Sequence, residues 1–228
     1  MKVNLEANPV LYAGLTQVLK RGTARILEET ENGIFLLDTV SSGVMLAVEN
    51  VEIGKEWLRK HSDLHSTLFS VFDRELVGFI RAEYGLTEVL DCYQAFYPLN
   101  TPPTYGKNLQ IRCATQQDLP IVLAHYDKLS EAELKQIIAQ GNLFLAFHNG
   151  KAVGFVGEHL EGSMGLLEVF PDCRRQGYGA ELESFMISRM LERGLLPYCQ
   201  VEVDNEKSLA LQRKLGMTLS RENIYWVF

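Results

Sequence analysis

The chain has 228 residues, of which 46% are hydrophobic and 22% charged, which suits one large globular domain or two small ones. Its formal net charge is −7, from 22 basic and 29 acidic residues. This balance disfavours a nucleic-acid partner, which needs a basic face, and it is compatible with a cationic amine as substrate.

No apolar run reaches the roughly 18 residues that a membrane span needs. Glu6 and Asn8 interrupt the first residues, which therefore do not resemble a signal peptide. A cytoplasmic protein without a membrane partner is the simplest prediction. The four cysteines are scattered and contain no Cys-x-x-Cys pair, so neither a metal site nor a disulfide framework is expected.

The first half is predicted to contain a helix, three strands, a helix, a strand, a helix and a strand. Asn8 is the expected N-cap of the first helix, with Pro9 at its first position and Gly22 at its end. Hydrophobic periodicity and turn residues place the following elements at 24–29, 33–39, 44–49, 52–60, 67–72, 74–84 and 89–97.

The second half repeats this order. A helix is predicted at 131–139, strands at 143–147, 152–158 and 163–169, and then helix, strand, helix and strand. The repeat favours a first half that is a degenerate copy of the second, in a mixed α/β fold. An unrelated small α+β domain is the alternative, because element order is a weak signal. The turn-rich segment Leu99–Gly106 is the predicted linker, giving domains 1–106 and 107–228.

Residues 169–183, VFPDCRRQGYGAELE, are predicted to form a strand, a glycine loop and a helix. Gly177 and Gly179 allow the backbone to close around a phosphate, and the first N–H groups of the helix point towards it. Arg174 and Arg175 add positive charge. The loop is therefore a candidate pyrophosphate site, and a plain strand-to-helix turn is the alternative. A carboxylate placed at Gly179 should point outward and repel the phosphates.

Two common phosphate loops are excluded. A dinucleotide fingerprint needs a third glycine where this chain has Leu182, and a Walker loop needs Lys after Gly179, where Ala180 stands. The motif Arg174-x-x-Gly177-x-Gly179 instead resembles the R/Q-x-x-G-x-G/A signature of the GNAT acyltransferases. The segment from Asn205 to Met217 resembles their second signature, N-x-x-S/A-x-x-L-Y-x-x-L-G-F/M.

The resemblance covers about residues 109–228 and implies a GNAT fold that holds acyl-coenzyme A, without a metal. Tandem halves with one competent loop resemble the glycine N-acyltransferase branch. The first-half counterpart of the loop, residues 49–54, has two carboxylates and no arginine, so it should repel a pyrophosphate. The residues implied in cofactor binding are Val169, Phe170, Arg174, Arg175, Gln176, Gly177, Tyr178, Gly179, Ala180, Asn205 and Ser208.

Glu168 and Glu161 are the candidate catalytic bases. In the family the base often lies early on the strand before the loop, where this chain has Ser163. Glu168 lies in an otherwise apolar strand, where an unpaired carboxylate is costly, whereas Glu161 is expected at a solvated hairpin tip. Regular alternation puts Glu168 and Ser163 on opposite faces unless the strand contains a bulge. His159 is a third option, because imidazole titrates near neutral pH.

The chain also departs from the family at Gln212, where many members carry the tyrosine that protonates the leaving thiolate. Water, or one of Tyr178, Tyr198 and Tyr225, would have to take this role. The predicted function is transfer of an acetyl group from acetyl-CoA to a primary amine of a small molecule or amino acid, by direct attack. The alternative is a non-catalytic protein that binds or senses acyl-CoA.

Overall fold

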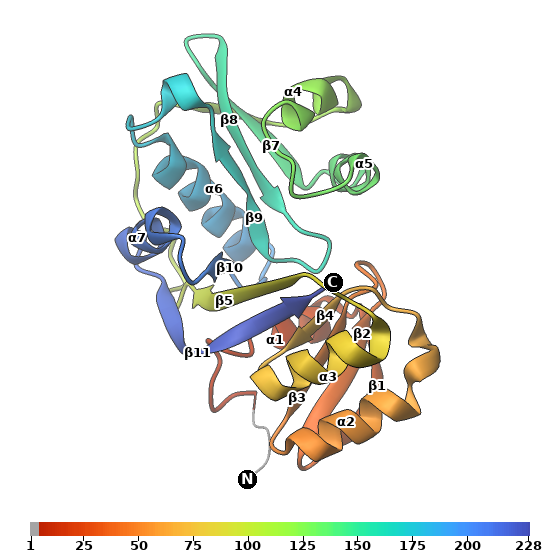
Figure 1. Ribbon diagram of the computed structural model, residues 1–228. Coiled ribbons are helices and arrows are strands. Elements are labelled where there is room, and N and C mark those ends of the chain that lie inside the picture. The colour runs from red at the N-terminus through yellow and green to blue at the C-terminus, as the bar shows by residue number, and fades with distance from the viewer. Residues whose placement is uncertain (1–4) are drawn as a thin grey trace. The chain divides into compact units, whose positions relative to one another are not determined.

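The computed structural model describes residues 5–228 and confirms a mixed α/β fold (Figure 1). The described strands form a seven-stranded sheet and a four-stranded sheet. The chain divides into two compact units. The first unit holds the residues up to Phe96 together with Gln200–Leu209 and Thr218–Phe228, and the second holds Tyr97–Cys199 and Ala210–Met217.

The first unit is built on the seven-stranded sheet, whose order is β1-β2-β3-β4-β11-β5-β10. The division between the units passes through β10 and α7. The helices and strands of the first unit are α1 (Ala13–Arg21), β1 (Ala24–Thr30), β2 (Gly33–Asp38), β3 (Val44–Val48), α2 (Val51–Lys60), β4 (Phe69–Val71), α3 (Arg74–Tyr84), β5 (Val89–Phe96), β10 (Tyr198–Glu202) and β11 (Thr218–Val227).

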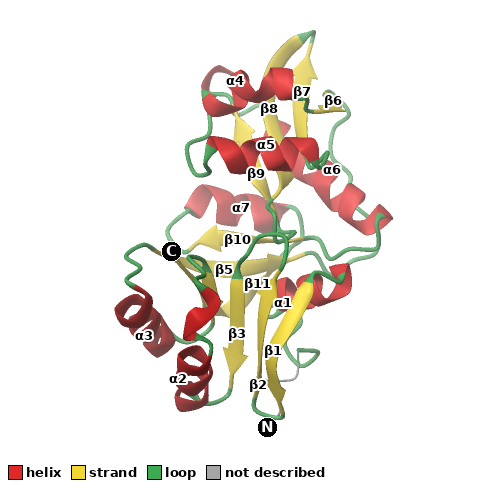
Figure 2. Ribbon diagram, turned by 90° about the vertical axis from the view of Figure 1, so that its right-hand side faces the viewer, coloured by secondary structure: helices red, strands yellow, loops and turns green. Residues whose placement is uncertain are grey.

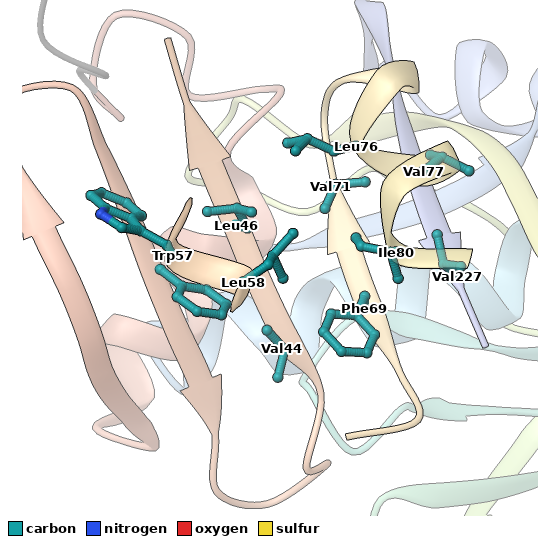
Figure 3. Close-up of a cluster of buried hydrophobic side chains, with 11 residues drawn as sticks. Val44, Leu46, Trp57, Leu58, Phe69, Val71, Leu76, Val77, Ile80 and Val227 are labelled. Carbon is teal, nitrogen blue, oxygen red and sulfur yellow. The ribbon is translucent and has the colours of Figure 1, made fainter. Parts of the chain in front are cut away.

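Helices pack on both faces of this sheet at β3. Successive side chains of a strand point to opposite faces, so one strand contributes to two hydrophobic clusters. On one face, Val44 and Leu46 of β3 pack with Trp57 and Leu58 of α2 and with residues of α3, in the cluster drawn in Figure 3. On the other face, Met45 and Ala47 pack with Leu15 and Val18 of α1. The buried strands β2 and β3 therefore lie between two helical layers.

Most helix ends in this unit are where the sequence predicts them. Asn50 and Asp73 cap α2 and α3 by accepting hydrogen bonds from the second N–H group of each helix, at 2.8 and 2.7 Å. Gly22 and Gly85 end α1 and α3 in the left-handed conformation. The predicted start of the first helix is wrong: residues 5–12 form turns, and the helix begins at Ala13.

The second unit is built on the antiparallel sheet β6-β7-β8-β9. Figure 2 shows α4 and α5 on one face of this sheet and α6 on the other. Leu143 and Leu145 of β7 pack against the first pair of helices, while Phe144 meets Phe185 of α6. The elements are β6 (Gln110–Cys113), α4 (Leu119–Leu123), α5 (Glu131–Ala139), β7 (Leu143–His148), β8 (Lys151–Glu158), β9 (Met164–Val169), α6 (Tyr178–Glu192) and the end of α7 (Glu206–Lys214).

The two compact units are not the two contiguous halves of the chain. Strand β11, at the end of the sequence, pairs with β4 and with β5, both from the first half. The C-terminal strand thereby belongs to the first unit. A boundary at 106/107 between two copies of one fold stays a prediction, since a division into compact units does not test a repeat.

The position of β11 predicts that residues 107–228 do not fold as a separate fragment. Deleting residues 1–106 removes both partner strands of β11 and exposes Ile224, Trp226 and Val227, each at most 8% exposed in the full chain. Unpaired edges that carry buried apolar residues lead to aggregation. Circular dichroism and gel filtration of the fragment and the full chain test this. A monomeric fragment with a cooperative thermal transition would contradict it.

Candidate functional site

The loop between β9 and α6 presents a run of backbone N–H groups. Within residues 5–228, none of the N–H groups of residues 175–179 has an acceptor. Arg175 and Gly177 adopt positive φ, +62° and +85°. Alternation with left-handed residues turns successive N–H groups to one side and forms a concave anion site, called a nest. We refer to residues 175–179 as the amide loop.

The N-terminus of α6 has no side-chain cap, unlike the N-termini of α2, α3 and α5. Its N-cap is Gly177, which has no side chain to accept from the first turn. In the first half, the N-terminus of α2 at the corresponding place is closed by the side chain of Asn50. Since a 15-residue helix carries positive charge at its N-terminus, the uncapped end of α6 suits an anion. The N-termini of α2 and α6 thus differ in capping as well as in the charges of the loops before them, and the correspondence between the two loops stays a prediction.

The two arginines before the glycines, Arg174 and Arg175, differ in their hydrogen-bond and ion-pair partners. Arg174 donates from Nε to the carbonyl of Val169, at 2.9 Å, and from a terminal nitrogen to Glu168, at 2.8 Å. It therefore ties the loop to the end of β9. Arg175 is exposed and has no ion-pair or hydrogen-bond partner among the described residues. Of the two, Arg175 is the cation free to meet a ligand.

The ion pair with Arg174 changes the interpretation of Glu168. The sequence suggested a costly unpaired carboxylate, but the side chain is 23% exposed and paired. Replacing Glu168 by Gln should raise the KM of an anionic ligand of the amide loop by up to about fivefold, the worth of a partly exposed ion pair, with kcat unchanged. A general base would show the opposite pattern, a fall in kcat of about 10²–10⁴-fold. Steady-state kinetics over a range of ligand concentrations separates the two.

Gly179 is enclosed rather than open. A Cβ atom at this position would lie 3.8 Å from Leu211 of α7 and 3.8 Å from Val169 of β9. A side chain here would begin between these two apolar residues, and the outward direction expected for its carboxylate stays a prediction. Position 179 is therefore unsuitable for a charge-reversal test, and Arg175 is the better choice.

Strand β9 contains the bulge on which the geometry of the candidate bases depends. Gly165 pairs with Gly157 and Glu168 with Phe155, so three steps on β9 match two on β8. Leu166 has a φ of +49°, an uncommon value for a branched residue. Because of the extra residue, Gly165 and Glu168 lie on the same face of the sheet. Strict alternation along the strand would put them on opposite faces. The bulge also leaves one residue of β9 out of regular pairing beside the amide loop.

Glu161 is buried, not solvated as expected. It is 8% exposed and accepts a hydrogen bond at 2.5 Å from the hydroxyl of Ser163, which is fully buried. The hydroxyl of Tyr198 lies 3.4 Å from the Glu161 carbonyl oxygen. No ion pair neutralises Glu161 within the described chain. Its carboxylate is therefore held by a hydroxyl and not by a cation among the described residues.

The remaining predicted site residues are in defined positions. The Val169 carbonyl and the Phe170 N–H already have partners, Arg174 and the Val153 carbonyl. The Tyr178 hydroxyl donates to Gln176, at 2.9 Å. His159 packs its ring over Gly165, where any side chain would collide with it. This contact gives the histidine a packing role.

Asn205 is the N-cap of α7, as predicted, and accepts from the N–H of Ser208 at 3.1 Å. Both residues belong to the first unit, whereas the amide loop belongs to the second. Their part in cofactor binding stays a prediction.

Sequence reasoning did not find Glu183, a buried carboxyl of the second unit whose pKa is raised. It lies on α6, is 4% exposed, and accepts from the Gln212 amide at 2.8 Å. Burial raises the pKa of Glu183 to about 7. The apolar neighbours Leu182 and Met186 in the sequence indicate a buried stretch, but the partner on α7 cannot be found from spacing alone.

Comparison with known proteins agrees with this geometry. Residues 107–217 match the model of the Acetyltransferase (GNAT) family. Two solved structures share the fold along nearly the whole chain: a GCN5-related N-acetyltransferase from Kribbella flavida and a GNAT-family acetyltransferase from Colwellia psychrerythraea. The first has a TM-score of 0.57 and 14% identity over 100% of this chain and 95% of its own. The second has 0.53 and 16% over 95% and 97%.

The chain has the GNAT acetyltransferase fold. A curated relative, the N-alpha-acetyltransferase MAK3 of Arabidopsis thaliana, is 37% identical over 81 residues, which is 32% of this chain and 43% of the relative. Because the match spans less than half of that relative, it does not assign an acceptor. Within residues 5–228, no helix is long and apolar enough to cross a membrane, and no group of three potential metal ligands is gathered.

Proposed function

We propose that this protein is an N-acetyltransferase that moves the acetyl group of acetyl-CoA to a primary amine. The observation that carries the proposal is the amide loop at the uncapped N-terminus of α6, in a GNAT fold. Five N–H groups without acceptors and the free cation Arg175 suit the pyrophosphate of coenzyme A. The predicted contacts at Gln176, Gly177, Tyr178 and Gly179 would be made by their backbone N–H groups, whereas the N–H of Ala180 already donates to the Gly177 carbonyl.

Acetyl-CoA supplies an activated thioester, so the reaction needs no covalent intermediate on the protein. The amine nitrogen attacks the carbonyl carbon, the new C–N bond forms, and the C–S bond breaks. The amine must lose a proton, and we propose that it passes to Glu161, directly or through water. Glu161 is favoured over Glu168 because, among residues 5–228, the partner of its carboxylate is the Ser163 hydroxyl, whereas Glu168 pairs with Arg174.

The acceptor is proposed to be the amine of a small molecule or an amino acid, as in the glycine N-acyltransferase branch. Support comes from the tandem order of elements and from the closed N-terminus of α2, which leaves one competent loop. The N-terminal amine of a polypeptide is the second candidate, because the matched relative is named for N-alpha-acetylation. A non-catalytic acyl-CoA-binding protein remains the alternative in a different class. A cytoplasmic location stays a prediction from the sequence.

A coenzyme A release assay tests the proposal. The full chain is incubated with acetyl-CoA and, in turn, amino acids, polyamines, aminoglycosides and short peptides with free N-termini, and free thiol is followed. Release stimulated at least tenfold by one acceptor class supports the acetyltransferase and names the class. Binding of acetyl-CoA without release by any acceptor favours the non-catalytic alternative. Absence of binding contradicts both.

A further inference from the structure

Two buried polar groups link α6 to α7 one helical turn after the amide loop. Glu183 of α6 and Gln212 of α7 are 4% and 2% exposed, and the Gln212 amide donates to Glu183 Oε1 at 2.8 Å. The other oxygen of each group, Glu183 Oε2 and Gln212 Oε1, is buried without a hydrogen-bond partner. Unsatisfied buried oxygens are costly, and here two of them belong to groups that already touch.

One proton between these two oxygens would give each of them a hydrogen-bond partner. Carboxylate and amide oxygens are both acceptors, so two such atoms cannot pair with each other. A proton on Glu183 Oε2 makes it a donor, and Gln212 Oε1 is the free acceptor of the amide that already contacts the carboxyl group. The acid and the amide then form a closed ring of two hydrogen bonds. No buried oxygen is left over, and no charge is buried.

The surroundings favour the neutral acid. Besides Gln212, the group acting on the carboxyl is the thiol of Cys199 in β10, 3.9 Å from Oε1. Neither carries a positive charge, and no ion pair of Glu183 is present in the described chain. The raised pKa of Glu183, about 7 and caused mainly by burial, agrees with a retained proton.

We propose that Glu183 is a positioning residue that holds a proton and, through Gln212, fixes α7 against the helix that begins at the amide loop. Gly179 precedes Glu183 by one turn on α6, and Leu211 beside Gln212 lies 3.8 Å from the Gly179 Cβ position. Opening the ring would loosen the wall on which Gly179 rests. The inference builds on the proposed function in one respect: the amide loop is taken to bind acetyl-CoA.

The sign of the pH dependence follows from the proton. The folded-state pKa, about 7, lies above the ordinary 4.5, so the native state keeps a proton that the unfolded state loses. The stabilisation is complete below pH 4.5 and is lost as the pH rises through 7. Acetyl-CoA affinity depends on the proton of the folded protein alone, so it should fall as the pH rises above 7.

Glu183→Gln is the matched test, because a Gln side chain can form the same two hydrogen bonds with Gln212 but cannot ionise. We expect the wild-type Tm to fall relative to the Tm of the variant as the pH rises from 4.5 through 7, and the difference to stay nearly constant at higher pH. We expect the wild-type KM for acetyl-CoA to rise by up to about tenfold per pH unit above 7, the limit for binding that requires one proton, and the variant KM to lack this rise. Ionisation of the phosphates is common to both proteins and cancels in the comparison.

Coinciding pH curves of Tm for the two proteins would overturn the retained proton. A Tm difference with coinciding KM curves would leave the proton in place and overturn the positioning role. If neither protein binds acetyl-CoA at pH 6, the proposed function is contradicted. The pH curves of Tm would still test whether Glu183 retains a proton. If the variant does not fold, carboxyl ¹³C shifts of Glu-labelled wild-type protein decide whether a Glu keeps its proton at pH 6 and loses it by pH 8.5. A Gln212→Leu variant removes the amide that donates to the carboxylate, so the pKa of the titrating group should rise further if that group is Glu183, and an unchanged titration would overturn the proposal.

Discussion

Replacing Glu161 by Gln is expected to lower kcat by about 10²-fold or more, the usual cost of losing a general base. Glutamine keeps the size of the side chain and an oxygen that accepts from Ser163, so the fold should hold. The KM for acetyl-CoA should stay within about twofold, because Glu161 lies outside the amide loop and the change removes only the proton acceptor. Steady-state kinetics with the acceptor found by the release screen gives both constants.

A Ser163→Ala variant is the control for the Glu161 result. It removes the hydrogen bond that the Glu161 carboxylate accepts from the Ser163 hydroxyl but leaves the base in place. We expect a smaller loss of kcat than in Glu161→Gln. Equal kcat values for Glu161→Gln and the wild type would exclude Glu161 as the base. A collapse of kcat in Glu168→Gln instead would move the role to that residue.

Replacing Arg175 by Glu should weaken acetyl-CoA binding by about 10²-fold. One charge-assisted hydrogen bond to phosphate contributes about 1.5–3 kcal/mol, and the new carboxylate adds repulsion at the amide loop. Arg175 is exposed, so the variant should fold normally, and its positive φ of +62° is unfavourable for Arg and Glu alike. Thermal melts with and without acetyl-CoA report the change, because a ligand at 100 times its Kd adds about 2.7 kcal/mol of stability.

Arg221→Glu is a matched control with the same change in net charge. Arg221 is exposed on β11, in the other unit, and has no ion pair within the described residues. It should leave the shift in Tm with acetyl-CoA unchanged. An equal loss in both variants would mean that overall charge, not the amide loop, governs binding.

The local pattern of the chain predicts the site's scaffold well. Gly177 and Gly179 after an apolar strand indicate the loop, and the elements on both sides of it lie within about two residues of their predicted ends. Asn205, Asp73 and Gly85 end or begin helices where their chemistry requires. These features depend on neighbours in sequence, which is why the sequence reveals them.

The sequence does not predict the features that depend on contacts between segments far apart in the chain. The ion pair of Glu168 forms because the loop brings Arg174 back over the end of β9. The bulge at Leu166 is visible only in the register with β8. The partner of Gln212 is a carboxyl 29 positions earlier, and no periodicity connects the two. The pairing of β11 with β4 and β5 likewise depends on tertiary structure.

The central claim is that the amide loop holds the pyrophosphate of acetyl-CoA. Isothermal titration of acetyl-CoA and of S-acetylpantetheine, which lacks the nucleotide and the pyrophosphate, into the full chain tests it most directly. The account predicts that wild-type protein binds acetyl-CoA at least about 10²-fold more tightly, from contacts of about 3 kcal/mol or more, and that Arg175→Glu removes most of this difference. Equal affinities for the two ligands in the wild-type protein would contradict it.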